Sequence, residues 1–464
     1  MDSGHTRRAF IQSALALGSL VATEPAHAFA TPAGPAAARH NPKDDVRYPL
    51  LLPDEVPASL SELTCAPALV NMGDGKLRRV LAYNGRFPGP TWVSRTGDWI
   101  SVRLQNGLAE PTITHWHGLV VNFANDGGPL LEIGSGQFYD YNFQIVQRAG
   151  LNFYHPHPHM LTGKQVCLGL AGAFIVRDDE EDGLGLPAGP YEVPLVIRDA
   201  SFDKQGGLLY NAASSGFSGK FPLVNGTLNS MLAVDGGVYR FRVLNGANAR
   251  VFTLALSNGA QFVVIGNDGG LLAAPVSVAQ IPLGMGERLD LLVDFSALRA
   301  GETVTLRCLG SRWDLLRFVG TGAKGLSFSP PSTLSSIAPL AGPSQPTRTF
   351  SFDGMSRING LQYEHNRVDF RVPLGVTERW RFKTGGNAPH PVHVHGASFQ
   401  VVSRTGGRGR LFPWESGWKD TVLLNDKETV DILIRFTEYR GAYVMHCHQL
   451  EHEDMGMMTN FEVD

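Results

Sequence analysis

Cysteine, net charge and long apolar runs are all scarce in this sequence of 464 residues, and each scarcity narrows the possible functions. The four cysteines are far apart and form no Cys-x-x-Cys pair, so no local disulfide framework is indicated. The formal net charge is −3, which points away from nucleic acid and anionic membranes as partners. After the N-terminal segment no apolar run is long enough to span a bilayer, and we expect no membrane span.

The cysteines also limit the disulfides that the chain could form. Cys447 stands between two histidines and is assigned to a metal below, which leaves an odd number of cysteines. We therefore expect Cys167 and Cys308 to be buried free thiols, and whether Cys65 pairs is left open.

Glycine and proline are abundant, with 53 and 29 residues, and long amphipathic runs are few. This composition favours a turn-rich, mostly β protein, and the length suggests roughly three domains. Strand patterns and Gly/Pro-rich linkers divide the chain into a first block at 46–178, a second at 190–320 and a third at 346–464. Similar strands recur in each block, which predicts three copies of one β-sandwich.

The N-terminus has the features of an export signal. Arg7-Arg8 precedes the apolar run Ala14–Ala22, and Ala26-His27-Ala28 is a small-x-small cleavage site. The paired arginines predict a twin-arginine signal peptide at residues 1–28 and a periplasmic or secreted protein.

The most informative stretch lies near the C-terminus, where Cys447 is followed by His452 and Met457. A cysteine, two imidazoles and a weak thioether form the ligand set of a blue-copper site. Successive strand side chains point to opposite faces, so His446 and His448 share one face while Cys447 occupies the other. On its own, such a segment could equally be a zinc fragment or a packed core thiol.

None of the 15 histidines lies in the second block, and most cluster in the first and third. Each His-x-His pair on a strand puts two imidazoles on one face, and eight such imidazoles could hold three coppers with room for an oxygen ligand. His390 lies an odd number of residues before His393 and should face the side of Cys447, as the second imidazole of the blue-copper site. The four pairs are His115 and His117, His155 and His157, His393 and His395, and His446 and His448.

Together these segments resemble the four copper motifs of the multicopper oxidases, the class that contains laccases and bilirubin oxidase. The motifs are His115-Trp-His-Gly, His155-Pro-His, His390-Pro-Val-His-Val-His-Gly and His446-Cys-His-x3-His-x4-Met457. The similarity points to the bacterial three-domain laccase and copper-efflux oxidase branch. It implies an all-β fold of three cupredoxin-like Greek-key β-sandwich domains, with a copper-free second domain as a spacer.

The resemblance also implies four copper ions and their ligands. His390, Cys447, His452 and axial Met457 would bind one type 1 copper, and His115 with His393 one type 2 copper. The two type 3 coppers would be bound by His117, His155, His157, His395, His446 and His448. By parity His159 could also be a ligand, but the family pattern uses His155 and His157, so His159 is expected to lie behind the ligands. Met455 or Met458 could replace Met457, although the spacing from Cys447 favours Met457.

Reduction of O2 to two waters needs four electrons and four protons, and protons need a carboxylate beside the metals. Asp126 and Glu453 match acidic positions that the family uses, and both are predicted to act catalytically. Each has a simpler interpretation. Asp126 could be a turn residue before Gly-Gly, and Glu453 a solvated charge.

We therefore predict an enzyme, a laccase-like multicopper oxidase that oxidises phenols or aryl amines one electron at a time and reduces O2. The alternative is a metallo-oxidase for Cu(I) or another metal ion. The linker at 320–346 contains no methionine, and residues 385–389 lack the Asp and Met of a Cu(I) site, so a phenol oxidase with an open blue-copper edge is preferred. A nitrite reductase would need no type 3 pair, and a cell-division scaffold would have lost ligands. We expect a monomer with O2 and a small-molecule or metal-ion donor as partners.

Overall fold

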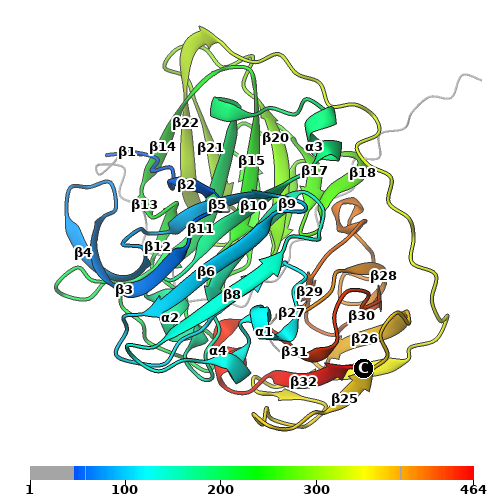
Figure 1. Cartoon of the computed structure of the whole chain (residues 1–464). Helices are drawn as coiled ribbons and strands as arrows, with labels where there is room; N and C mark the ends of the chain where they lie inside the picture. Colours follow the sequence, from blue (N-terminus) through cyan, green and yellow to red (C-terminus); the bar gives the residue numbers. More distant parts are fainter. Residues whose placement is uncertain (1–45, 58, 387–388) are drawn as a thin grey trace, which may run out of the picture.

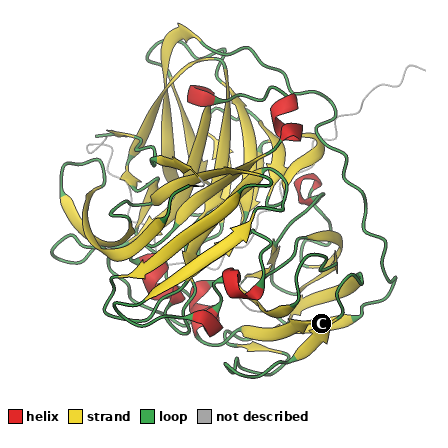
Figure 2. Ribbon diagram, in the orientation of Figure 1, coloured by secondary structure: helices red, strands yellow, loops and turns green. Residues whose placement is uncertain are grey.

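The computed structural model describes residues 46–57, 59–386 and 389–464 and consists mainly of β-strands (Figure 2). The predicted signal peptide at 1–28 lies outside these residues. Within them, no helix combines the length and hydrophobicity that crossing a membrane requires. The prediction of an all-β fold built from cupredoxin-like sandwiches is confirmed, because six sheets pack in pairs around separate cores.

The first pair of sheets contains strands of the first block. One sheet has the order β2-β5-β10-β9-β7 and the other β4-β3-β6-β8. The strands are β2 (Glu55–Pro57), β3 (Glu62–Asn71), β4 (Leu77–Tyr83), β5 (Gly89–Arg95), β6 (Trp99–Asn106), β7 (Thr114–His117), β8 (Phe138–Gln144), β9 (Gly150–Pro156) and β10 (Gly172–Arg177).

The second pair has the orders β13-β12-β11-β15-β20-β17-β18 and β1-β14-β22-β21-β16-β19. Its first strand, β1 (Tyr48–Pro49), comes from the start of the described chain and pairs in parallel with β14. The others are β11 (Glu192–Ala200), β12 (Phe221–Val224), β13 (Thr227–Leu228), β14 (Ser230–Gly236), β15 (Val238–Asn245), β16 (Phe252–Leu256), β17 (Phe262–Asn267), β18 (Gly270–Val278), β19 (Gln280–Leu283), β20 (Arg288–Asp294), β21 (Thr303–Cys308) and β22 (Trp313–Lys324).

The third pair has the orders β24-β23-β26-β30-β28 and β25-β32-β31-β27-β29. Its strands are β23 (Arg348–Asp353), β24 (Arg357–Ile358), β25 (Phe370–Val372), β26 (Glu378–Thr384), β27 (His390–Val394), β28 (Phe399–Gly406), β29 (Thr421–Leu424), β30 (Glu428–Ile434), β31 (Gly441–Cys447) and β32 (Met458–Val463).

Helices are short and lie at the ends of the sheets. The α-helices are α1 (Phe123–Asp126), α2 (Thr162–Cys167), α3 (Asp179–Gly183) and α4 (Leu450–Asp454), and the 3-10 helices are η2 (Pro129–Leu131), η3 (Gly189–Tyr191) and η4 (Pro413–Glu415). In Figure 1, α4 and β31 of the C-terminal end lie beside α1 and α2 of the first block. The first and third blocks therefore meet, and the segment after β22 runs along the outside of the molecule to reach the third.

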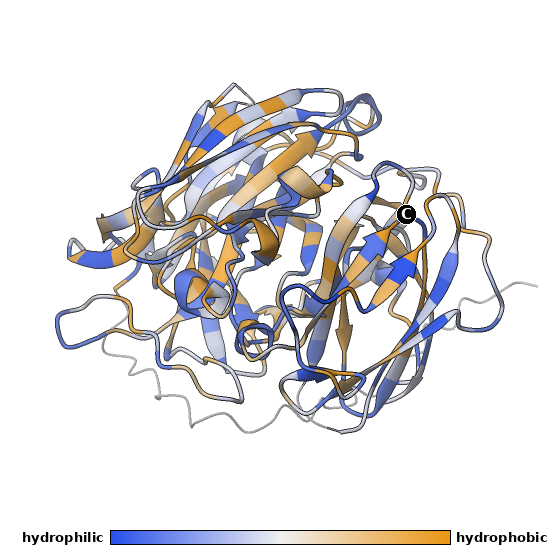
Figure 3. Cartoon of the chain, turned by 60° about the horizontal axis from the view of Figure 1, so that its bottom comes forward, coloured by the Kyte–Doolittle hydropathy of each residue, from blue (hydrophilic) through white to orange (hydrophobic). Residues whose placement is uncertain are grey.

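Alternation of apolar and polar residues explains why these segments form half-buried strands (Figure 3). In β6, for example, Ile100, Val102 and Leu104 are buried while the intervening residues face outward. Strand β15 differs because both of its faces are buried. Its Arg240 and Arg242 are paired with carboxylates, among them Glu181, so this strand sits inside an ionic network rather than at a surface.

Candidate metal centre

The four His-x-His segments occupy strand ends in two sheets that face each other. In the first block β7 pairs with β9, and His115 lies opposite His155. In the third block β27 pairs with β31, and His393 lies opposite His446. Residues opposite each other in an antiparallel pair project from the same face, so each sheet presents its histidines together.

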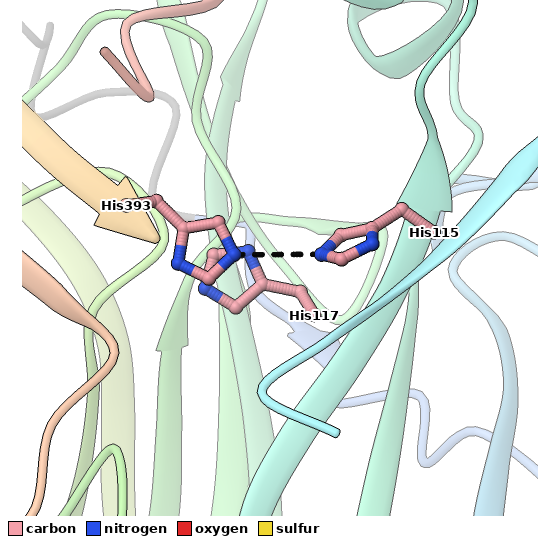
Figure 4. A group of neighbouring side chains, drawn as sticks. All are labelled: His115, His117 and His393. Carbon is pink, nitrogen blue, oxygen red and sulfur yellow. Dashed lines mark hydrogen bonds between the residues drawn. The ribbon is translucent and has the colours of Figure 1, made fainter. Parts of the chain in front are cut away.

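The histidines of the first and third blocks meet in one buried cluster. The His115 ring stacks on His395 with centroids 3.8 Å apart, and the His117 ring stacks on His393 at 3.6 Å. His393 Nε2 lies 3.4 Å from His115 Nε2 (Figure 4). All eight side chains that were predicted to bind type 2 and type 3 copper are therefore brought together.

Ring nitrogens within this cluster converge in groups that could each hold a metal ion. The Nε2 atom of His446 lies 3.3 Å from that of His157 and 3.2 Å from that of His395. A second group contains His117, His155 and His448, and a third contains His115, His117 and His393. Within each group the candidate ligand atoms lie within 4.8 Å of one another.

In several of these rings the nitrogen that points away from the cluster is held by a hydrogen bond. This bond fixes the direction of the other ring nitrogen, which points into the cluster. The Nδ1 atoms of His115, His155 and His393 lie 2.7, 2.9 and 2.8 Å from the backbone oxygens of Asp126, Pro156 and Asp420. Within the described residues, the opposite nitrogen of His155 is buried without a hydrogen-bond partner, as are both ring nitrogens of His448. Buried, unpartnered nitrogens with anchored rings are the arrangement that a metal would satisfy, and the donor set fits copper.

Burial also keeps the imidazoles neutral, which is the form that binds metal. Burial lowers the pKa of His155 to about 3 and that of His157 to about 4. The pKa of His115 and that of His395 are likewise lowered well below the ordinary value, first by burial and then by neighbouring imidazoles. The imidazoles of the cluster can therefore offer nitrogen lone pairs to a metal instead of repelling it as cations.

The predicted blue-copper residues form a separate site on the opposite face of β31. Cys447 Sγ lies 3.4 Å from His390 Nδ1 and 3.7 Å from His452 Nδ1, and these two nitrogens are 3.2 Å apart. All three residues are fully buried. His390 therefore lies on the side of Cys447, as its odd spacing from His393 predicts.

Met457 is the methionine best placed beside this site. It packs in the same buried cluster as Cys447, and its backbone oxygen accepts a hydrogen bond from the Cys447 amide at 3.0 Å. Met458 pairs with His446 across the sheet and so projects from the other face. All four cysteines, Cys447 included, are buried and free.

Asp126 and Glu453 each contact histidines of the cluster. Asp126 Oδ2 is 2.8 Å from His395 Nδ1, and Glu453 Oε2 is 3.0 Å from His446 Nδ1. Both carboxyl groups are buried, which argues against a solvated charge at Glu453. Because Asp126 faces the Nδ1 atoms, it supports the rings from behind and leaves their Nε2 atoms free for metal.

The two carboxyl groups differ in their affinity for a proton. Burial raises the pKa of Asp126 well above its ordinary value. Burial alone would also raise the pKa of Glu453, but His157 and His446 lower it overall. The same cluster therefore contacts two buried carboxyl groups whose pKa values are shifted in opposite directions, and such a difference can separate the roles of acid and base.

The expectation of an open blue-copper edge is wrong. His390 and His452 are fully buried, and His452 Nε2 is 2.9 Å from Nε2 of Gln449. The Gln449 amide in turn donates to the backbone oxygen of Ser215 at 3.0 Å. A loop of the second block thus covers the site, and sequence reasoning could not foresee it because no local pattern encodes such a long-range contact.

Sequence reasoning also missed several side chains around the cluster. His117 Nε2 lies 3.0 Å from both Asp420 Oδ1 and Thr421 Oγ1, and Asp420 is paired with Arg288. The available signal was that Asp420 directly precedes the apolar strand β29 and Arg288 begins the apolar strand β20, because a buried charged residue is rare without a partner. His159, which was not expected to be a ligand, contacts the rings of Tyr363 and His365.

Two buried sites, one of sulfur and imidazole and one of imidazole alone, define a copper protein built on cupredoxin-like sandwiches. Models of the multicopper oxidase family match residues 64–181, 181–302 and 338–464. The chain belongs to the multicopper oxidase family. Membership implies copper binding and a reaction between an electron donor and O2.

Individual relatives agree on the family but differ in their names. The chain is 34% identical to multicopper oxidase mco of Staphylococcus haemolyticus (82% of this chain, 83% of that protein) and 30% identical to a laccase of Bacillus subtilis (83% and 90%). It is also 34% identical to cell division protein FtsP of Dickeya dadantii (82% and 84%). The crystal structure of McoA multicopper oxidase from Aquifex aeolicus aligns with a TM-score of 0.85 at 34% identity (90% and 100%).

Proposed function

We propose that this protein is a laccase-like multicopper oxidase that couples one-electron oxidation of phenols or aryl amines to the four-electron reduction of O2 to water. His390, Cys447, His452 and Met457 would hold one type 1 copper. The eight imidazoles of the histidine cluster would hold one type 2 and two type 3 coppers, divided as the sequence predicts. Copper at these sites would supply one-electron redox chemistry and the place where O2 is reduced.

The observation that carries the proposal is the direct covalent link between the two sites. Cys447 belongs to the sulfur site, while its neighbours His446 and His448 belong to the histidine cluster. Strand β31 therefore presents both sites on its two faces and provides a short through-bond connection. A copper-storage protein would not require this connection.

Protons for O2 reduction would come through the flanking carboxyl groups. The raised pKa of Asp126 and its hydrogen bond with His395 suit a proton donor. Glu453, whose pKa is lowered beside His157 and His446, is the second carboxyl group that we place on the proton path. A small cavity of about 10 Å³ beside His115 and His393 has about the volume of one water molecule.

An organic donor is favoured over a metal ion by what surrounds the sulfur site. His452 is covered by a neutral amide and a backbone oxygen, from Gln449 and Ser215. The linker at 320–346 contains no methionine. Oxidation of Cu(I) or another metal ion is the second candidate, because a structural neighbour from Campylobacter jejuni is titled a metallo-oxidase.

A scaffold role, suggested by the FtsP relatives, is disfavoured because every predicted histidine and cysteine ligand is present and lies buried in a group with others. We further propose that the protein works as a monomer and is exported by the twin-arginine route to the periplasm or beyond.

The test is to load the protein with copper, measure copper per chain, and compare O2 uptake with a dimethoxyphenol, bilirubin, Cu(I), Fe(II) and Mn(II). The proposal expects blue colour, four coppers and the highest kcat/KM with the phenol. Faster turnover of Cu(I) or another metal ion would favour the second candidate. Copper binding without any O2 uptake would reject both.

A further inference from the structure

Arg288, at the start of β20 in the second block, is fully buried beside the histidine cluster, and its contacts span all three blocks. Its Nε donates to the backbone oxygen of Leu151 in the first block at 2.9 Å. Its terminal nitrogens donate to the backbone oxygens of Gly286 and Asp268 at 3.0 and 3.1 Å. They also donate hydrogen bonds to both carboxylate oxygens of Asp420 in the third block. All five N–H groups of the guanidinium are therefore used.

Asp420, which is held by Arg288, in turn contacts His117, a predicted metal ligand. His117 Nε2 lies 3.0 Å from Asp420 Oδ1 and 3.0 Å from Thr421 Oγ1. The Thr421 hydroxyl donates its own proton to Asp420 at 2.9 Å, so only acceptors face His117 Nε2. That nitrogen consequently carries the proton, and Nδ1 is left with a free lone pair. Nδ1 is buried and has no hydrogen-bond partner among the described residues.

The local packing leaves little room for another arrangement. Gly118 follows His117 at φ +91°, and a Cβ there would come closest to Asn152 and would also lie within 2.6 Å of Arg288 and 3.1 Å of Asp420. Next to the Arg288–Asp420 pair, Lys419 Nζ lies 2.8 Å from Asp268 Oδ2 and so balances a further buried carboxylate. The glycine after His117 is therefore explained by its positive φ and by Asn152 and the ion pair packed against it.

From this geometry we infer that Arg288 is a positioning residue for the trinuclear copper site, acting through Asp420 to fix the ring orientation and tautomer of His117. The second block, expected to be only a spacer, thereby contributes to the metal centre without supplying a ligand. The inference rests on the proposed function, because it assumes that the histidine cluster binds copper.

Replacing Arg288 with lysine tests this role, because lysine keeps the charge but cannot grip both oxygens of Asp420 and reach three backbone oxygens. In Arg288→Lys we expect copper binding at the histidine cluster to weaken by about 10- to 100-fold in a chelator titration. The near-ultraviolet absorption of the type 3 pair should fall and the type 2 EPR signal should change. The blue absorption and potential of the type 1 site should remain as in the wild type.

The matched control is Arg240→Lys, since Arg240 is an equally buried arginine of the second block whose carboxylate partners are Glu181 and Asp290. Arg240→Lys should lower thermal stability about as much as Arg288→Lys does. It should leave the type 3 absorption and the type 2 EPR signal unchanged.

Two outcomes would overturn the inference. One is wild-type type 2 and type 3 signals in Arg288→Lys despite reduced stability, which would make Arg288 merely structural. The other is a parallel loss of type 1 and cluster copper in both variants, which would indicate general destabilisation. Failure of the wild type to bind copper in the cluster would instead refute the proposed function, so the two failures are distinguishable.

Discussion

The environments of Asp126 and Glu453 show how single residues divide the proton chemistry. Both carboxyl groups are buried and each contacts a histidine of the cluster, yet their pKa values move in opposite directions. At Glu453 the effect of burial is outweighed by His157 and His446, at 3.5 and 3.0 Å, whereas at Asp126 burial dominates although His395 and His115 lie 2.8 and 3.7 Å away. Sequence position alone identified both residues but could not show in which direction the pKa of each is shifted.

Asp126→Asn should slow the reoxidation of reduced enzyme by O2 by about 100-fold, because an amide cannot deliver a proton to the cluster. The blue colour should persist, since Asp126 does not belong to the sulfur site. Stopped-flow mixing of reduced enzyme with O2 measures this directly. The matched control is Asp140→Asn, an exposed aspartate paired with Arg103. Reoxidation at the wild-type rate in Asp126→Asn would remove Asp126 from the mechanism.

Met457→Leu should raise the potential of the type 1 site, because loss of a thioether ligand destabilises the oxidised metal. Redox titration of the blue absorption gives the value. Met458→Leu serves as the control because Met458 pairs with His446 and projects from the opposite face. A lowered or unchanged potential in Met457→Leu, or an equal rise in both variants, would argue against axial coordination by Met457.

Among the elements, β27 and β31 were the most predictable from sequence. The alternation of strand side chains placed His390 on the face of Cys447 and placed His393 on the face of His446, and the observed register agrees. The cover over His452 was not predictable, because Gln449 and Ser215 are distant in sequence and meet only through the packing of two blocks. Local periodicity predicts faces, whereas contacts between domains require the tertiary structure.

The loop around Ser215 should therefore limit access of donors to the type 1 site. Gly216→Ala should displace it, because a Cβ at Gly216, where φ is +95°, would come within 2.6 Å of the Gln449 amide. We expect a higher kcat/KM for bulky phenols with little change in the potential.

Gly206→Ala is the matched control, since Gly206 has a similar φ of +84° but no described atom within 4 Å of its Cβ position. Steady-state kinetics with phenols of increasing size would decide the matter. Equal effects of the two variants, or a lower rate in Gly216→Ala alone, would contradict a covering role.

At the scale of the whole molecule, acidity should weaken the second block through its buried ionic network. Burial alone would raise the pKa of Glu192, but Arg242, and then Arg177 and Arg240, lower it to about 2. The folded pKa is below the ordinary value of 4.5, so the unfolded chain binds the proton first as pH falls. The resulting stability is fully present above pH 4.5 and is lost as pH approaches 2.

Glu192 should therefore contribute about 3 kcal/mol to the free energy of unfolding at neutral pH, lost across this acid window. Urea unfolding of the wild type and of Glu192→Gln at several pH values measures the contribution. The variant should be less stable at neutral pH and should depend less on pH in the acid range. Parallel curves for the two proteins would show that Glu192 is not responsible.

Much of the fold and the metal centre followed from sequence, for reasons that differ between them. Turn residues and alternating strands indicated three sandwiches, and the four His-x-His segments indicated which ends of the chain must meet. The domain limits stay predictions, and β1 shows why they are hard to draw, since Tyr48 pairs with a strand of the second block. The role of Arg288 was hidden because its partners come from three blocks.

The central claim is that two donor sets on the two faces of β31 hold four coppers. Anomalous diffraction from crystals of the copper-loaded protein, measured on both sides of the copper absorption edge, tests it most directly. The account predicts one peak between His390, Cys447 and His452 and three peaks among the eight imidazoles of the histidine cluster. A single peak beside Cys447, or an empty histidine cluster in fully loaded protein, would contradict it.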